Sequence, residues 1–523
     1  MIQFNNFDKA PSYSLLKKEK LANLKELLNK KRIEDFQIPI AGNLKFNYAC
    51  RPVSKSTLAL LEKIAKEQQL IEKYRLLLNG EVINTGENRK VLHQLTRGQC
   101  DKKVIEDKTD IGAFYKQQLK RFCDFADKVH SGEIVGSTGK PFKQVVQIGI
   151  GGSDLGPRAI YLALKGYAVK KGSLKMKGYF ISNVDPDDAN DVLEDIDYET
   201  TLFILVSKSG TTQETLTNQA FVFEKMKNQK IRGFIPSKHM VAVTSATSPL
   251  ANSSEYLDSF YIDDYIGGRY SSCSAVGGVI LSLTFGPAIF KEFLKGAHEA
   301  DLSALQNDIY KNAALMDALI GVFERLMGLS TTVILPYSQA LSRFPAHLQQ
   351  MDMESNGKSV NRDGKKINYK TGPALLGEPG TNGQHSFYQL LHQGSDILPL
   401  QFIGFKKSQR GFDLKIDGST SQKKLNANLI AQLFAFALGK DDKNPNKQFN
   451  GNRYSSLIYG DELTPKNMGA LLAHYENKVM FQGFIWNINS FDQEGVQLGK
   501  ILTKKILNGD MSQELATFST FLL

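Results

Sequence analysis

A run of five apolar residues, 202–206, constrains the fold of this chain more than any other segment. It shows no polar alternation, which is typical of a parallel strand covered on both faces. Similar short apolar runs lie at 145–150, 179–184 and 240–244, and helical stretches separate them. Strands that alternate with helices predict βαβ units and a doubly wound sheet, so the predicted fold class is α/β.

The chain is long enough for more than one such unit. Its 523 residues exceed what one ordinary hydrophobic core supports. A second series of candidate strands lies at 332–335, 397–403 and 457–459, and the N-terminal part is Lys-rich with apolar positions at helical spacing. We therefore predict a helical N-terminal segment that packs on the large domain and two mainly parallel α/β domains, the second ending in helices. Their predicted bounds are 1–114, 115–290 and 291–523.

Three further segments carry local signals. Thr464 before a proline predicts a helix start, and Ser490 opens a capping-box pattern that predicts another. The helix that follows should end at Leu507, before an Asn-Gly pair. The uncharged run 270–290 contains four serines, three glycines and a proline. This run is not apolar enough for a membrane span, so we expect a buried strand-to-helix segment.

Composition narrows the class of protein. Four widely spaced cysteines form no Cys-x-x-Cys pair, which argues against a zinc site and a disulfide framework. The N-terminus lacks the apolar core of a secretory signal, so we expect a cytoplasmic protein with no membrane partner. The net charge of +11 comes from lysines interleaved with acids, which predicts no nucleic-acid partner. A diffuse positive field instead favours small anionic ligands.

A glycine-rich turn at 149–156 follows the first predicted strand and opens a helix. Glycines there let a ligand approach the backbone, and a helix N-terminus attracts anions. The turn is similar to a dinucleotide-binding fingerprint, but Asp154 occupies the third glycine position and would face a pyrophosphate. A nicotinamide enzyme is therefore disfavoured. A turn needed only for close packing explains the local pattern equally well.

A cluster of hydroxyls follows the strand 202–206, immediately before another helix. Hydroxyls, backbone N–H groups and a helix N-terminus together form a cradle for a phosphate monoester. The alternative is helix capping, because Thr211 and Glu214 have capping-box spacing. Capping would explain one threonine only, so we favour phosphate binding. The cluster comprises Ser207, Lys208, Ser209, Thr211 and Thr212.

The segment QQMDMESNGK at 349–358 predicts a short helix that begins near Pro345 and ends at Asn356-Gly357. Gln350 and Glu354 are four residues apart, so both side chains can face one ligand. A carboxylate so placed is a candidate general base. The alternative is a solvated Glu and Gln on a surface helix.

Three more residues are candidates for chemistry. Arg269 follows two glycines, which suggests a guanidinium brought close to a ligand, although the preceding aspartates could equally pair with it. His385, on a Gly/Asn-rich loop, is an acid–base candidate in a chain with eight histidines, although a lone histidine is more often structural. Lys500 follows a helix-weakening glycine that needs a reason, such as a nearby ligand. The alternative is a plain surface lysine.

Taken together, seven ordered segments resemble the glucose-6-phosphate isomerase family, also called phosphoglucose isomerase. They span more than 400 residues, which is far more specific than any one segment. The segments are GENRKVLH at 86–93, GIGGSDLGP at 149–157, SKSGTTQET at 207–215, GGRYS at 267–271, QQMDMESNGK at 349–358, GTNGQHSFYQL at 380–390 and GVQLGK at 495–500.

The resemblance implies two sugar-isomerase (SIS) domains, each a mainly parallel sheet flanked by helices, in a homodimer with shared active sites. It implies reversible aldose–ketose isomerisation of glucose 6-phosphate and fructose 6-phosphate through a cis-enediol, in glycolysis and gluconeogenesis. No metal or organic cofactor is implied. The substrate would be a small sugar phosphate.

Carried over residue by residue, the resemblance implies that Glu354 is the base and that Arg269 stabilises the enediolate. His385 would assist ring opening from the neighbouring subunit, with Lys500 at the ring oxygen. The phosphate would lie on the hydroxyl cluster, and the other implied substrate-binding residues are Gly152, Ser153, Gly210, Gln350 and Gln493.

Some positions depart from the family pattern. Gly210 stands where relatives often carry an aromatic residue, Glu494 replaces a usual Trp, and Gln497 replaces a usual Glu near Lys500. Two alternatives to the implied function stay open at this point. One is an isomerase of a different sugar phosphate, such as mannose 6-phosphate. The other is a sugar-phosphate-binding regulatory module that retains the fold without the chemistry.

Overall fold

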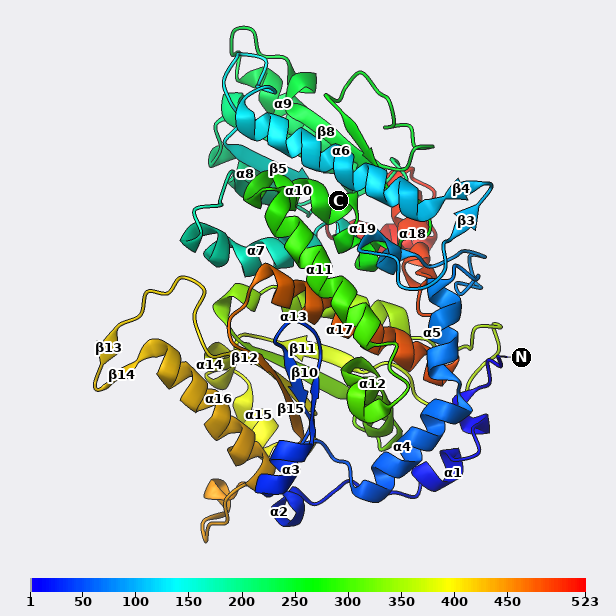
Figure 1. Cartoon of the computed structure of the whole chain (residues 1–523). Coiled ribbons are helices and arrows are strands. Elements are labelled where there is room, and N and C mark those ends of the chain that lie inside the picture. The colour runs from blue at the N-terminus through cyan, green and yellow to red at the C-terminus, as the bar shows by residue number, and fades with distance from the viewer. Residues whose placement is uncertain (1) are drawn as a thin grey trace.

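The computed structural model describes residues 2–523 and contains two large β-sheets, one above the other in Figure 1. The upper sheet has five strands, all parallel, in the order β6-β5-β7-β8-β9. Four of them lie where the apolar runs predict strands, and β9 is added at one edge. Their bounds are β5 (Gln144–Ile148), β6 (Lys177–Ile181), β7 (Thr201–Val206), β8 (Met240–Thr244) and β9 (Ser259–Tyr261).

Helices cover both faces of this sheet, as the unbroken apolar run of β7 predicts. Leu202 and Ile204 pack into the core formed with α6, α7 and α10, whereas Phe203 and Leu205 pack against α8 and α9. Alternate residues of one strand therefore serve two cores, and the doubly wound arrangement is confirmed. The helices are α6 (Ile111–Ser131), α7 (Leu155–Lys170), α8 (Pro186–Glu194), α9 (Gln213–Asn228) and α10 (Ala275–Phe285).

The lower sheet has six strands in the order β1-β2-β15-β12-β10-β11. The last four pair in parallel, and β1 and β2 add an antiparallel edge from the N-terminal segment. Sequence periodicity predicts helices in that segment, and it misses these strands because each is three residues long. The bounds are β1 (Gln37–Pro39), β2 (Lys45–Asn47), β10 (Thr331–Tyr337), β11 (Ala374–Gly377), β12 (Leu400–Phe405) and β15 (Ser455–Gly460).

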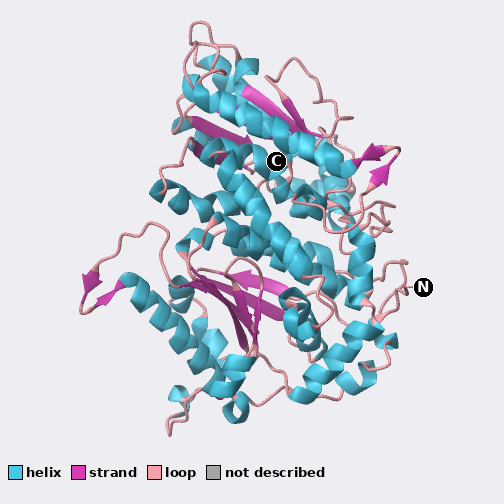
Figure 2. Cartoon of the chain, in the orientation of Figure 1, coloured by secondary structure: helices cyan, strands magenta, loops and turns pink. Residues whose placement is uncertain are grey.

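The remaining elements lie around the lower sheet, apart from the last two helices and one hairpin, which lie beside the upper half of the molecule (Figures 1 and 2). A hairpin, β13 (Lys415–Ile416) and β14 (Ser419–Thr420), projects on the left of Figure 1, and a second, β3 (Ile105–Glu106) and β4 (Thr109–Asp110), lies at the upper right. The helices are α1 (Tyr13–Leu16), α2 (Leu24–Leu27), α3 (Lys30–Asp35), α4 (Lys55–Glu67), α5 (Leu70–Leu78), α12 (Ala313–Leu326), α13 (Phe344–Gln349), α14 (Gly380–Gln384), α15 (Tyr388–Gln393), α16 (Ser421–Leu438), α18 (Gln497–Leu507) and α19 (Gln513–Ser519).

Two helices, α11 (Pro287–Ser303) and α17 (Pro465–Trp486), cross between the sheets (Figure 1). They approach so closely that a Cβ on Gly296 would lie 1.8 Å from the Lys466 carbonyl oxygen, and one on Gly469 would lie 1.8 Å from the Phe293 carbonyl oxygen. Only glycine fits both positions. The predicted domain bounds at 114 and 290 fall within α6 and α11, and the division into an N-terminal segment and two domains stays a prediction.

The uncharged run 270–290 is buried, but the strand expected at its start is wrong. A 3-10 turn, Gly268–Cys273, leads into α10, and every residue of α10 is buried. An apolar run buried on all sides has no periodicity that distinguishes strand from helix, which explains the error. None of the helices in residues 2–523 combines the length and the apolarity that a bilayer crossing requires.

The C-terminal predictions are partly confirmed. Thr464 caps α17 by accepting a hydrogen bond from the Asn467 N–H, and α18 ends at Leu507 as predicted, although α19 follows it. The helix start predicted at Ser490 is wrong, because α18 begins only at Gln497. The Ser490 hydroxyl instead donates to Asn356 Oδ1 at 2.8 Å. A tertiary contact has overridden the local capping pattern.

A buried ion-pair network joins the N-terminal segment to the two crossing helices. Arg97 donates from Nε and Nη2 to the Asp301 carboxylate at 2.6 and 3.0 Å, and from Nη1 to Glu476 at 2.5 Å. Burial raises the pKa of Glu476 from 4.5 to about 7, against the opposing effect of Arg97. The folded chain therefore binds a proton at Glu476 between about pH 4.5 and 7 that the unfolded chain releases.

This proton makes stability depend on pH. The contribution of Glu476 protonation to the free energy of unfolding is fully present below the pKa that Glu476 has in the unfolded chain. It is lost as the pH rises through the pKa that Glu476 has in the folded chain. We expect wild-type unfolding free energy to fall from pH 5 to pH 8 by about 2–3 kcal/mol more than that of Glu476→Gln. Urea unfolding at both pH values measures this, with Glu255→Gln, an exposed carboxylate, as control. Parallel pH dependences for wild type and Glu476→Gln would contradict the prediction.

Candidate active site

The predicted helix around Glu354 is present, but its geometry differs from the expected α-helix. It begins at Phe344 with Pro345 in the first turn, and α13 ends at Gln349. The five residues 350–354 then form a wider π-helical turn, after which the helix closes at Asn356. Single π turns inside helices are frequent at functional sites. The side chain of Glu354 is 19% exposed, so the carboxylate is accessible from one side only.

Gln350 lies at the start of this turn, against the glycine-rich loop. Its Oε1 atom is buried and accepts no hydrogen bond from residues 2–523. Its Nε2 atom lies 3.3 Å from the position that a Cβ on Gly151 would occupy. A buried amide oxygen without a donor costs about 1–3 kcal/mol, so this atom is a ready acceptor for a ligand hydroxyl.

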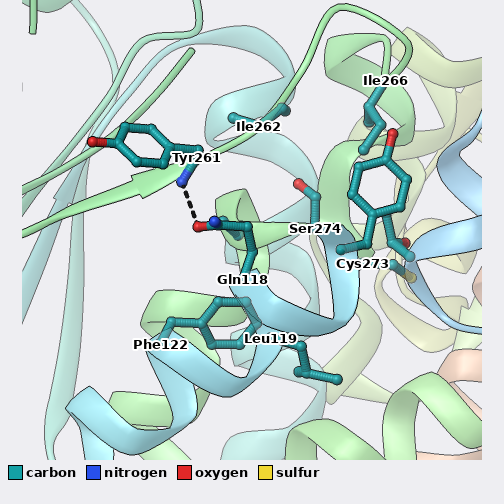
Figure 3. A pocket seen from close by; sticks show the side chains of 11 residues that line it. Gln118, Leu119, Phe122, Tyr261, Ile262, Ile266, Cys273 and Ser274 are labelled. Carbon is teal, nitrogen blue, oxygen red and sulfur yellow. Dashed lines mark hydrogen bonds between the residues drawn. The ribbon is translucent and has the colours of Figure 1, made fainter. Parts of the chain in front are cut away.

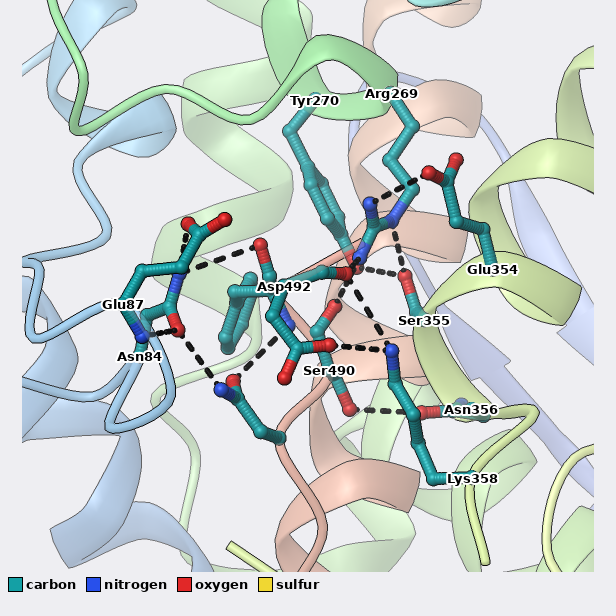
Figure 4. A network of polar contacts seen from close by, with 12 residues as sticks. Asn84, Glu87, Arg269, Tyr270, Glu354, Ser355, Asn356, Lys358, Ser490 and Asp492 are labelled. Atoms are coloured by element: carbon teal, nitrogen blue, oxygen red, sulfur yellow. Dashed lines mark hydrogen bonds and ion pairs between the residues drawn. The ribbon is translucent and has the colours of Figure 1, made fainter. Parts of the chain in front are cut away.

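Arg269 is the centre of the polar network in Figure 4. Its side chain is buried, and Nη1 lies 3.5 Å from Glu354 Oε1. Nε donates to Ser355 Oγ at 2.7 Å, and Nη2 donates to the carbonyl oxygens of Ser490 and Asp492 at 2.7 and 2.9 Å. The chain thus holds the guanidinium on three sides and leaves Nη1 toward the carboxylate.

The alternative expected for Arg269, a pairing with the preceding aspartates, is wrong. Asp264 instead lies 3.6 Å from Lys208 Nζ and 3.8 Å from Arg89 Nη2. Asp263 accepts a hydrogen bond from the Tyr265 N–H at 3.0 Å. The ion-pair partner of Arg269 is therefore Glu354, at 3.5 Å.

The segment 489–492, whose carbonyl oxygens hold Arg269, is itself anchored on two sides (Figure 4). Lys358 Nζ donates to Asp492 Oδ1 at 2.5 Å. On the other side, Asn489 donates to Asn84 Oδ1 at 2.8 Å. A segment tied to both neighbours presents its carbonyl groups at fixed positions.

The glycine-rich loop contacts the backbone next to Arg269. A Cβ on Gly152 would lie 2.1 Å from the Gly268 carbonyl oxygen, so only glycine permits this approach. Ser153 follows in the same 3-10 turn, before α7. Asp154 forms an ion pair with Arg158, at 2.7 Å between Oδ1 and Nε. The Asp154 carboxylate thus ties the end of the loop to Arg158 on α7.

The hydroxyl cluster lies at the carboxyl end of β7, where α9 begins. Thr212 is the N-cap residue of α9, and its side chain makes no capping hydrogen bond. Capping, the alternative to phosphate binding for these hydroxyls, is therefore wrong as an explanation of the cluster. Ser209 and Thr211 are exposed, and Lys208 donates to the Ile266 carbonyl oxygen at 3.3 Å. Hydroxyls, N–H groups and a cation meet here at a helix N-terminus.

The backbone conformation of Gly210 explains why this position lacks the aromatic residue that relatives often carry. Its φ of +67° is a conformation that favours glycine, and a Cβ would lie 2.2 Å from Ser248 Oγ. An aromatic side chain has no room here in this conformation. The loop thus follows a path that glycine alone permits.

Three predicted residues lie outside this cluster. His385 follows α14 directly, Lys500 lies on α18, and Gln493 precedes α18; all three are exposed. Within residues 2–523, no hydrogen bond or ion pair joins their side chains to Glu354 or Arg269. The structure thus brings together Gln350, Glu354, Arg269 and the glycine loop. Gln493 directly follows Asp492, whose carbonyl oxygen holds Arg269, but no side-chain hydrogen bond or ion pair in the described part of the chain joins Gln493, His385 or Lys500 to Glu354.

Other members of the network were not predicted as site residues. Three of them lie inside the segments that carry the family resemblance, which was the available signal. The other two follow α17, where the one pattern, a capping box at Ser490, points to a helix start and not to a site. The five residues are Tyr270, Ser355, Lys358, Ser490 and Asp492.

A separate pocket, shown in Figure 3, lies between α6, β9 and the 3-10 turn Gly268–Cys273. Gln118 accepts a hydrogen bond from the Tyr261 N–H at 3.0 Å on one of its walls. The pocket has room for about one water molecule. It is too small for a sugar phosphate.

Comparisons with known proteins bear on the family of the chain. The family model for phosphoglucose isomerase matches residues 47–520. A glucose-6-phosphate isomerase of Treponema denticola is 60% identical, with full coverage of both chains, and one of Treponema pallidum is 54% identical over 99% of this chain and 98% of that protein. A crystal structure of a glucose-6-phosphate isomerase from Chlamydia trachomatis has a TM-score of 0.91 at 41% identity, over 99% of both chains.

Sequence, fold and site therefore converge. The family model covers most of the chain, the relatives match it from end to end, and the base candidate and its arginine lie side by side. The chain belongs to the phosphoglucose isomerase family.

Proposed function

We propose that Glu354 is the base with which this chain moves a proton between C1 and C2 of an open-chain sugar phosphate, and that Arg269 stabilises the enediolate. The reaction is the family's: this chain interconverts glucose 6-phosphate and fructose 6-phosphate reversibly, through a cis-enediol, in glycolysis and gluconeogenesis. One observation carries the assignment of roles. Arg269 Nη1 lies 3.5 Å from Glu354 Oε1, while the other guanidinium nitrogens are bound by the chain.

The proposed steps follow from this arrangement. Glu354 takes the proton from C1 of open-chain fructose 6-phosphate, and negative charge develops on the sugar oxygens. Arg269 stabilises that charge, a role suited to a cation fixed where charge appears in the transition state. Glu354 then returns a proton to C2 while the hydroxyl proton on O1 moves to O2, which gives the aldose. Gln350, Gly152 and Ser153 would contact the sugar.

We assign the phosphate to the hydroxyl cluster at the start of α9. The exposed hydroxyls, Lys208 and the helix N-terminus are suited to a dianion. The hydroxyl of Thr212 makes no capping bond and accepts from Ser207 Oγ at 3.3 Å, so its own proton can be donated to the phosphate. The remaining members of the proposed phosphate site are Ser207, Ser209, Gly210 and Thr211.

We further propose that the site is completed by a second copy of the chain. His385, Lys500 and Gln493 are exposed and not joined to Glu354 within residues 2–523. His385 from the partner would open the sugar ring, with Lys500 at the ring oxygen and Gln493 in contact with substrate. A homodimer would supply what a single chain leaves incomplete.

Exposed apolar side chains support the homodimer. No residue of α18 is buried, and its Leu498 is 67% exposed. Phe518 on α19 and Phe521 just beyond it are 70% and 71% exposed, with their ring centroids 5.9 Å apart. Exposed apolar surface of this kind marks protein–protein interfaces. All four cysteines are free thiols, which supports the cytoplasmic location that we also propose.

Isomerisation of fructose 6-phosphate in deuterated water tests the proposed function. The proton on Glu354 exchanges with solvent while the enediol is bound, so deuterium should appear at C2 of the glucose 6-phosphate formed. Mass spectrometry of the product measures it, and mannose 6-phosphate is assayed in parallel. Tight binding without turnover would leave a regulatory module. Turnover and deuterium incorporation that persist in Glu354→Gln would remove Glu354 from the proposed role.

A further inference from the structure

We propose that Ser355 is a positioning residue: its hydroxyl, held by Tyr270, fixes the Arg269 guanidinium so that Nη1 alone is free for the enediolate. This inference rests on the proposed roles of Glu354 and Arg269. It assigns a function to Ser355 and Tyr270, to which no sequence pattern assigns one.

The partners of the N–H donors of Arg269 show why Ser355 matters. An arginine side chain has five N–H donors. One, on Nε, is bound by Ser355 Oγ, and Nη2 is bound by the carbonyl oxygens of Ser490 and Asp492. Only the donors on Nη1 then remain for Glu354 and a substrate. Among the three groups that hold the guanidinium, Ser355 is the one side chain and therefore the one that substitution can remove.

The Ser355 hydroxyl is itself held in place. Its Oγ lies 2.8 Å from the Tyr270 hydroxyl, and Ser355 is 0% and Tyr270 2% exposed. The Tyr270 ring also lies beside the guanidinium, 5.4 Å from its central carbon. Ser355 thus accepts from Arg269 and exchanges a second hydrogen bond with a rigid, buried phenol.

The other side of Tyr270 is closed by aromatic residues. The His93 ring lies 4.6 Å from the Tyr270 ring and Phe491 lies 5.4 Å from it, between centroids. Burial holds the pKa of His93 well below its usual range, so His93 is neutral and adds no second cation. Burial also raises the pKa of Tyr270 to about 12, so the phenol keeps its proton at neutral pH. His93 belongs to GENRKVLH, a segment to which the mechanism gives no role.

Ser355 also follows the base directly in sequence. Both lie at the end of the π-helical turn, so one backbone segment sets the position of Glu354 and of the group that holds Arg269. A misplacement of about 1 Å in such a constellation lowers rates by up to about 10²-fold. The expected consequence is on the chemical step and not on phosphate binding, which lies on a separate loop.

Steady-state kinetics of Ser355→Ala test the proposal. We expect kcat to fall by about 10- to 100-fold, with KM changed by less than about 3-fold. Ser12→Ala is the matched control, since Ser12 is also buried and its hydroxyl donates to Glu67 at 2.6 Å. This control loses a comparable buried hydrogen bond far from the site and should leave kcat unchanged. An unchanged kcat in folded Ser355→Ala would overturn the proposal, as would equal kcat losses in both variants.

A second variant covers the case in which Ser355→Ala does not fold. Tyr270→Phe removes only the hydroxyl that holds Ser355, and we expect kcat to fall about 3- to 10-fold. If Ser355→Ala folds, the double variant should lose no more than Ser355→Ala alone, because both act through one contact. An unchanged kcat in Tyr270→Phe, or additive losses, would count against the proposal. Failure of the proposed function would appear separately, as activity retained in Glu354→Gln.

Discussion

Glu354→Gln should lower kcat for fructose 6-phosphate by about 10³- to 10⁴-fold, the upper part of what a positioned general base contributes. The amide has the same shape as the carboxylate but cannot take a proton from C1. Its oxygen can still accept from Arg269 Nη1, so the surrounding network should persist. KM and phosphate binding should therefore change little, because the hydroxyl cluster at the start of α9 is untouched.

Initial rates and binding of fructose 6-phosphate by calorimetry measure the effect. Asp352→Asn is the matched control, since Asp352 lies on the same π-helical turn and its carboxylate accepts from Asn356 in the buried interior at 3.3 Å. This variant should retain most of the activity. Joint loss of binding and turnover in Glu354→Gln would mean that Glu354 has a structural role.

Mixing two inactive variants should restore activity. His385→Ala should lose about 10²- to 10⁴-fold in kcat on the cyclic sugar, and less on a substrate that is already open. In a heterodimer with Glu354→Gln, one of the two shared sites combines an intact Glu354 with an intact His385. Random assembly of equal amounts should therefore recover about one quarter of wild-type activity.

Co-refolded or co-expressed subunits give the measurement. If His385 acted within its own chain, every site of the heterodimer would carry one substitution and no activity would return. Pairing Glu354→Gln with a chain that carries both substitutions is the control, because that mixture contains no intact site. Recovery in the first mixture alone would establish the shared site.

The parts of the fold that local sequence determines were predicted well. The strand β7 is apolar from Leu202 to Val206 because helices cover both of its faces, and that requirement is visible in the residues themselves. The three-residue strands β1 and β2 carry no such signal, because their pairing depends on β15 more than 400 residues away. Ser490 has a capping pattern, yet its hydroxyl binds Asn356.

The candidate site also contains residues that sequence could suggest and residues that it could not. Residue type and spacing made Glu354, Gln350 and the hydroxyl cluster candidates, with a solvated surface helix as the alternative for the first two, and their roles stay proposals. The groups that fix Arg269 could not be predicted, since two of them are backbone carbonyls, which every residue possesses. The placement of His385 and Lys500 beside a base depends, in our proposal, on a second copy of the chain. No pattern in one chain specifies that geometry.

The π-helical turn at 350–354 makes the site depend on a residue count as well as on residue identity. Each residue of an α-helix advances the side-chain direction by about 100°. Loss of one residue between α13 and Glu354 would keep every functional group, yet it would rotate the carboxylate away from Arg269 unless the wide turn tightened in compensation. Insertions and deletions that the wide turn does not absorb would thus rotate Glu354 out of phase with Arg269, even though the neighbouring Met353 is 44% exposed.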